Sequence, residues 1–127
     1  MAKYENIRAL AKKQLQAVTE SSDRWKAFLR TAAIAYNYSF PNQLLIHEQS
    51  PTATAVADIA YWNNNAGRWV KRGAHGIAVF DTRANSSRLR YLFDISDTIP
   101  RAEIPEALPW VITDQNWRPV WDKNRSG

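Results

Sequence analysis

The spacing of apolar residues changes partway along the chain, and this change constrains the fold more than any other feature. Up to about residue 50, apolar residues recur every three or four positions, as on the buried side of a helix. From residue 68 onward they alternate with polar residues, which is typical of strands with one buried face. Helices followed by antiparallel strands predict an α+β fold. We expect N-terminal helices packed with a small antiparallel sheet, in a single domain of 127 residues.

Two amphipathic helices are predicted at the start of the chain. The first covers residues 4–20 and ends at the polar "ESSD" segment. The second covers about residues 22–37. Its apolar spacing predicts a buried side made of Trp25, Phe28, Leu29, Ala32, Ala33 and Tyr36. We therefore expect these side chains to belong to the core.

Capping residues indicate where two further helices begin. Ser39 can accept a hydrogen bond from a free N–H group of a third helix, Pro41 fits its first turn, and Pro51 ends it. Asp58 is a suitable cap for a short fourth helix that Gly67 closes. Both boundaries are read from local chemistry alone.

Three strands are predicted in the second half of the chain. They cover residues 68–72, 76–82 and about 87–95, with glycines in the turn between the first two. Residues 98–127 are rich in proline and tryptophan and predict an irregular C-terminal segment. Three tryptophans are expected to pin this segment: Trp110, Trp117 and Trp121.

Several classes of protein are disfavoured by what the sequence lacks. There is no cysteine, so disulfides, thiolate nucleophiles and cysteine-based zinc sites are excluded, in agreement with an intracellular, cytoplasmic setting. No apolar run is long enough to span a bilayer, and the N-terminus does not resemble a secretory signal. We expect no membrane association.

Motifs for catalysis or cofactor binding are also weak. His47 and Glu48 begin the H-E-x-x-H zinc pattern, but its second histidine would fall at Pro51, so we interpret His47 as an exposed helix residue. "GAHG" is too short for a phosphate-binding loop. The sequence therefore predicts a non-catalytic chain without a cofactor. One alternative is a metal-dependent nuclease built on three aspartates: Asp94, Asp97 and Asp114.

Positive charge is unevenly distributed along the sequence. The chain has 17 basic and 12 acidic residues, yet no lysine or arginine occurs between Arg30 and Arg68. The segment "GRWVKRG" then interleaves cations with an indole, which suits phosphates and unpaired bases. The alternative is an edge strand protected by charge. The candidate nucleic-acid-binding cations are Arg68, Lys71 and Arg72 on this strand, Arg88 and Arg90 on a later strand, and Lys12 and Lys13 on the first helix.

Three aromatic residues complete the candidate interface. Trp69 alternates with Arg68 and Arg72 and shares a strand face with Lys71, so it either stacks on a base or anchors the core. Tyr38 and Phe40 carry the same two alternatives. If the strands that carry Arg68 and Arg90 pair, their guanidinium groups join in one basic face.

Two stretches together resemble the N-terminal domain of the ArdC antirestriction protein family. They are "NYSFPNQLLI" at 37–46 and "PTATAVADIAYWNNNAGRWVKRGAHGIAVFD" at 51–81, within a similarity over roughly residues 5–95. The family pattern has a glycine where Pro41 stands here. The matching positions are Tyr38, Ser39, Phe40, Asn42, Gln43, Pro51, Ala53, Thr54, Trp62, Gly67, Val70, Gly73, Gly76 and Ile77.

The resemblance implies binding of single-stranded DNA by a protein of a plasmid or conjugative element. Such domains commonly precede another domain, so we expect the chain to be part of a longer protein. No metalloprotease region follows within these residues, so protease activity is not implied. The alternative function is a protein-interaction module that docks on an acidic partner in conjugation or restriction evasion. The amides of Asn42 and Gln43 are expected to support the fold by bonding local backbone or the adjacent loop.

Overall fold

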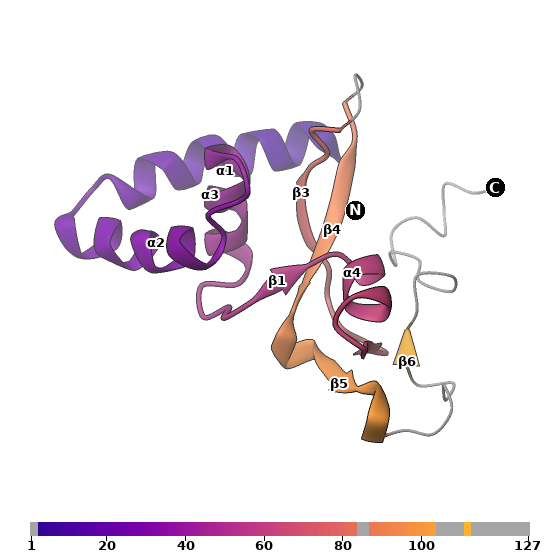
Figure 1. Ribbon diagram of the computed structural model, residues 1–127. Helices are drawn as coiled ribbons and strands as arrows, with labels where there is room; N and C mark the ends of the chain where they lie inside the picture. The colour runs from indigo at the N-terminus through magenta and orange to yellow at the C-terminus, as the bar shows by residue number, and fades with distance from the viewer. Residues whose placement is uncertain (1–2, 84–86, 104–110, 113–127) are drawn as a thin grey trace.

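The computed structural model describes residues 3–83, 87–103 and 111–112 (Figure 1). Its helices are α1 (Tyr4–Val18), α2 (Ser22–Ile34), α3 (Phe40–Gln49) and α4 (Ile59–Asn64), with 3₁₀ turns at Ile95–Asp97 and Arg101–Glu103. Its strands are β1 (Val56–Ala57), β2 (Arg68–Lys71), β3 (Ile77–Phe80), β4 (Leu89–Asp94), β5 (Thr98–Pro100) and β6 (Val111–Ile112).

The strands form two small antiparallel sheets, and the predicted α+β fold is confirmed. The first sheet has the order β1-β4-β3 and the second has the order β5-β2-β6. Figure 1 shows α1, α2 and α3 gathered at one end, β3 and β4 in the middle, and α4 with β5 and β6 at the other end. None of the described helices combines the length and hydropathy needed to cross a membrane.

The capping chemistry predicted from the sequence is confirmed. Ser39 Oγ accepts a hydrogen bond from Asn42 N at 3.4 Å at the start of α3. Asp58 Oδ1 accepts one from Tyr61 N at 2.8 Å at the start of α4. Gly67 adopts a positive φ of 64° just beyond α4, a conformation that glycine adopts without steric cost. Local sequence thus fixes both helix starts.

Among the residues that the structure describes, three clusters of buried side chains hold the fold together. The largest joins α1, α3, β3 and β4, with Leu45, Ile46, Val79 and Leu92 fully buried. A second lies beneath β2, where Val70 packs with the residues Ala57, Trp62 and Phe93. A third fills the space between the helices with Val18, Phe28 and Leu44.

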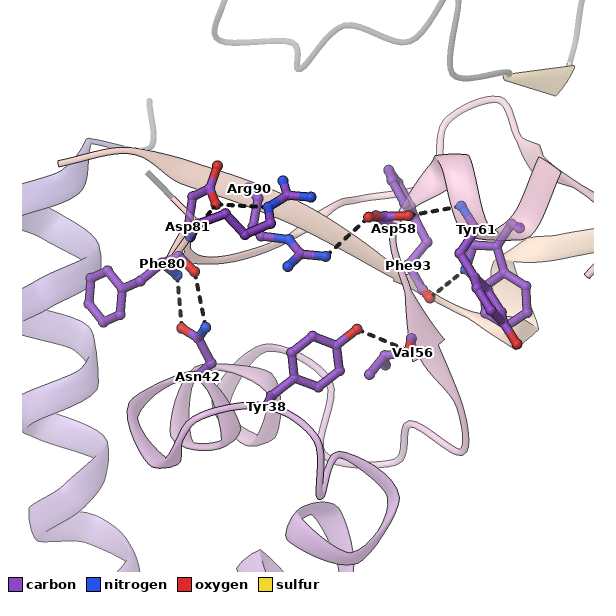
Figure 2. Close-up of polar contacts among 11 residues, drawn as sticks. Tyr38, Asn42, Val56, Asp58, Tyr61, Phe80, Asp81, Arg90 and Phe93 are labelled. Atoms are coloured by element: carbon purple, nitrogen blue, oxygen red, sulfur yellow. Dashed lines mark hydrogen bonds and ion pairs between the residues drawn. The ribbon is translucent and has the colours of Figure 1, made fainter. Parts of the chain in front are cut away.

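Side-chain amides from α3 occupy the edge of β3 that β4 leaves free. Asn42 donates to Phe80 O at 3.0 Å and accepts from Phe80 N at 2.8 Å (Figure 2). Gln49 makes the same pair of bonds to Ala78, at 2.8 and 2.9 Å. These amides satisfy the backbone as a neighbouring strand would, and they protect the edge from pairing with another chain.

The amide expectation is therefore partly confirmed and partly wrong. Gln43 Nε2 donates to Ala35 O and Tyr38 O, which is local backbone at the end of α2, as expected. Asn42 does not bond local backbone or the adjacent loop. It reaches Phe80, far along the chain, because α3 lies directly against β3.

The expected burial of Trp25, Leu29 and Tyr36 is wrong. Their exposed fractions are 37%, 46% and 80%. Helix α2 packs mainly against α3 and α1, along a narrow side centred on Phe28 and Thr31. It also ends at Ile34, so Tyr36 stands in the turn that follows rather than on the helix.

Two expectations for the second half of the chain are also corrected. Strands β2 and β3 are consecutive but belong to different sheets, because β4 and the α3 amides occupy both edges of β3. The segment after residue 97 is not entirely irregular, since β5 and β6 both pair with β2. The predicted tryptophan anchors lie outside the described residues: Trp110, Trp117 and Trp121.

Candidate nucleic-acid interface

The two faces of β2 have different roles. Val70 is fully buried on the face that covers the second cluster. Arg68 lies on the same face by alternation, and it bonds Thr98 on β5: Nε donates to Oγ1 at 2.5 Å and Nη2 donates to the carbonyl oxygen at 3.3 Å. Arg68 thus joins two strands, and its guanidinium group is engaged within the fold.

The opposite face of β2 carries an indole covered by a guanidinium group. The Arg101 guanidinium carbon lies 4.5 Å from the centre of the Trp69 ring, in cation–π geometry. Arg101 also donates to Asn63 O, which holds it in place. Trp69 is half-buried beside Ile99 on β5, and its buried Nε1 has no hydrogen-bond partner within the described part of the chain.

Two more cations, Lys71 and Arg72, follow Trp69 by two and three positions in the sequence. Lys71 is exposed, shares the Trp69 face by alternation, and donates to Ser96 O at 3.3 Å. Arg72 follows the end of β2 and is exposed, as is Arg101. We call Trp69, Lys71 and Arg101, together with Arg72 in the turn that follows β2, the Trp69 face. It combines a stacked pair, the Trp69 ring and the Arg101 guanidinium group, with the long, exposed side chains of Lys71 and Arg72.

Arg88, just before β4, and Arg90, on β4, do not join this face. Among the described strands, β4 pairs with β1 and β3 and not with β2, so the condition for one shared basic face is not met. Arg90 instead forms a partly buried ion pair with Asp58, with 3.1 Å between Nη2 and Oδ2, and lies 5.9 Å from the Tyr38 ring centre (Figure 2). It links β4 to the capping residue of α4. Arg88 is exposed.

The remaining candidates lie elsewhere. Tyr38 is half-buried against the main core, and its hydroxyl donates to Val56 O at 3.5 Å. Burial raises the pKa of that hydroxyl. Phe40 is 43% exposed and meets Phe28 edge-on at 5.7 Å. Lys12 and Lys13 are exposed on α1. The ten sequence candidates are thus spread over several surfaces.

Asp94 has a structural role at the end of β4. Its Oδ1 accepts from Thr54 N and Ala55 N at 2.9 and 3.1 Å, and its Oδ2 accepts from Ser96 N and Oγ at 3.1 and 2.5 Å. Burial raises the pKa of this carboxyl, but the hydrogen bonds from Ser96, Ala55 and Thr54 outweigh burial and hold the pKa below its usual value. Each oxygen of the Asp94 carboxylate therefore already accepts two hydrogen bonds from the protein.

No metal centre is assembled from the residues that the structure describes. They contain no group of three or more histidine, aspartate or glutamate side chains close enough to hold an ion, and Asp114 lies outside them. The interpretation of His47 as exposed is wrong. It is half-buried, its Nδ1 shares a hydrogen bond with Thr31 Oγ1 at 2.8 Å, and burial lowers its pKa.

Arg101 is the functional candidate that the sequence reasoning missed. It falls in the segment interpreted as irregular, so no strand register was assigned to it. The pairing of β5 with β2 sets Ile99 opposite Trp69, and Arg101, directly after β5, donates its N–H to Gly67 O at 2.8 Å, which brings it next to Trp69. That register depends on a long-range pairing, and no local signal in the sequence reveals it.

Comparison of the chain with family models, curated proteins and solved structures finds no match.

Proposed function

We propose that this chain binds single-stranded DNA with little sequence preference through the Trp69 face. The observation that carries the proposal is the Arg101 guanidinium lying 4.5 Å from the Trp69 ring centre, on a strand face that also carries Lys71. Arginine planes and aromatic rings both stack on unpaired bases. The resemblance to the ArdC N-terminal domain supports the same function.

In this proposal, a base stacks on the guanidinium plane of Arg101, which Trp69 supports from beneath. Lys71 and Arg72 contact the phosphates on either side of that base. Stacking accepts any base because every base has a π-face, so sequence preference is weak. Each phosphate neutralised contributes a slope of about −0.7 to the logarithm of affinity against the logarithm of salt concentration.

Fluorescence anisotropy with labelled oligonucleotides tests this proposal. We expect a random single strand of about 16 nucleotides to bind more tightly than its duplex, with affinity falling steeply between about 50 and 200 mM salt. The double variant Lys71→Ala/Arg72→Ala should lower the salt slope by about 1.4, for two lost phosphate contacts. The matched control Lys12→Ala/Lys13→Ala removes the same charge from α1. Equal losses in the two variants, or a preference for duplex, would contradict the proposal.

Single substitutions at Trp69 and Arg101 separate stacking from charge. Arg101→Lys keeps the cation but removes the planar group, so it should weaken binding, and Trp69→Ala should cost ~1–3 kcal/mol of binding energy. Thermal melting of each variant provides the control. If Trp69→Ala unfolds the protein, Arg101→Lys still decides the matter, because Arg101 is exposed. Unchanged binding by Arg101→Lys would remove the stacking role.

A further inference from the structure

Apolar side chains remain exposed on the outer side of α2. Trp25 and Leu29 are 37% and 46% exposed and are four positions apart, so they project from the same side of the helix. Tyr36, which follows α2, is 80% exposed, and Phe40 at the start of α3 is 43% exposed. We call these four residues the α2–α3 surface. Exposed apolar side chains that form a contiguous patch mark interaction sites, whereas single ones do not.

Buried aromatic packing holds this surface in shape. Phe28 is buried between the rings of Trp25 and Phe40, with ring centres 5.4 and 5.7 Å away. Both partly exposed rings are therefore anchored on the same core residue, which connects the exposed apolar groups of α2 and α3. A hollow beside Trp25 opens at the N-terminal end of α2, lined also by Thr19, Ser21 and Ser22.

Cations line one side of the α2–α3 surface. Lys26 and Arg30 each follow one of its apolar residues by one position, so they project about 100° further around the helix. Both are exposed, and neither forms an ion pair with any described residue. Arg24, in contrast, is paired with Glu20 at 3.1 Å. The unpaired charges favour a partner that is acidic along one edge.

We propose that the α2–α3 surface binds an amphipathic helix of another protein, whose apolar side covers Trp25 and Leu29 and whose acidic edge meets Lys26 and Arg30. Apolar positions at i and i+4 are the pattern by which one helix packs on another. One residue of the α2–α3 surface is the aliphatic Leu29, which offers no π-face to a base. The surface also lies at the opposite end of the molecule from β5 and β6 (Figure 1), so it is independent of the proposed DNA interface.

Designed peptides test the proposed partner chemistry. The probe is a labelled helical peptide of about 14 residues, with leucines along one side and glutamates along one edge. A second peptide carries lysines in place of the glutamates. We expect the acidic peptide to bind about tenfold more tightly than the basic one. Leu29→Gln should weaken the acidic peptide about tenfold without lowering the melting temperature, since Leu29 is exposed.

Charge reversal provides the sharper arm of the experiment. Lys26→Glu/Arg30→Glu should reverse the preference, so that the basic peptide binds more tightly. The control Lys12→Glu/Lys13→Glu makes the same charge change on α1 and should leave the preference intact. Equal binding of both peptides, or no reversal, would overturn the proposal. So would sedimentation showing a dimer that Leu29→Gln abolishes, or loss of single-stranded DNA binding from Lys26→Ala/Arg30→Ala, because these outcomes assign the surface to a second copy or to nucleic acid.

Discussion

Strands β3 and β2 have four residues each, but they are held in place by different means. One edge of β3 pairs with β4, and the other is bonded by side-chain amides of α3. Strand β2 pairs with strands on both edges, β5 and β6, and Arg68 adds a side-chain link to β5. The comparison shows two ways to satisfy a short strand. At β3, the polar side chains of α3 form hydrogen bonds within the fold. At β2, the strands supply the hydrogen bonds, and most of the cations remain exposed.

Removing one amide should have the largest effect, because it leaves backbone groups of β3 without partners. Asn42 is buried and bonds both the N–H and the carbonyl of Phe80. We expect Asn42→Ala to lower the free energy of unfolding by about 2–6 kcal/mol, since it leaves two backbone groups unpaired and each costs about 1–3 kcal/mol. Urea denaturation measures this loss. Asn64→Ala, at an exposed position of α4, serves as control. A change as small as the control's would show that water or a neighbour replaces the amide.

The cations of β2 should divide according to the face on which they lie. Arg68→Ala removes both bonds to Thr98, and hydrogen bonds of charged groups contribute about 1.5–3 kcal/mol. Lys71→Ala alters an exposed side chain and should change stability within about 0.5 kcal/mol. Parallel thermal melts of the two variants measure the difference. If both are equally stable, Arg68 does not hold β5 to β2, and the structural assignment of its face is wrong.

The sequence predicted those parts of the molecule that depend on neighbours in the chain. Ser39 and Asp58 cap helices through residues three positions away, so both starts could be predicted. Pairing over long distances could not. The Asn42 to Phe80 bonds span 38 positions, and β2 finds its partners in a segment that carries proline rather than a strand pattern.

The candidate site shows the same limit. Alternation correctly separated Arg68 from Trp69, but it could not tell which of the two faces is buried. That distinction depends on Val70, which packs on Trp62 and Phe93 from elements before and after β2. The role of Arg90 is likewise set by Asp58, 32 positions earlier. Placing Arg101 beside Trp69 required knowledge of how β5 pairs with β2. The sequence therefore shows which cations lie on strands. It does not show which of them bond within the fold and which remain free to contact a ligand.

The smallest expected effect is a loss of stability in acid at the junction between the two sheets. Asp94 ends β4, bonds the chain just before β1 through Thr54 and Ala55, and bonds Ser96 on the path to β5. Its pKa is lower in the folded chain than in the unfolded chain, where aspartate titrates near pH ~3.9. The stability that ionised Asp94 contributes is therefore complete above that value and is lost as pH falls through the lower, folded pKa.

Denaturation of the wild type and Asp94→Asn across this pH range measures the contribution. Asparagine offers one acceptor oxygen where the carboxylate offers two, so the variant should be less stable near neutral pH. The difference between the two proteins should shrink below about pH 4, as Asp94 itself becomes protonated. The effect is limited because burial, which raises the pKa, offsets part of the gain from the hydrogen bonds. Asp23→Asn removes a charge from an exposed position and controls for net charge. A difference that stays constant down to pH ~2.5 would mean that ionisation of Asp94 does not contribute to joining the two sheets.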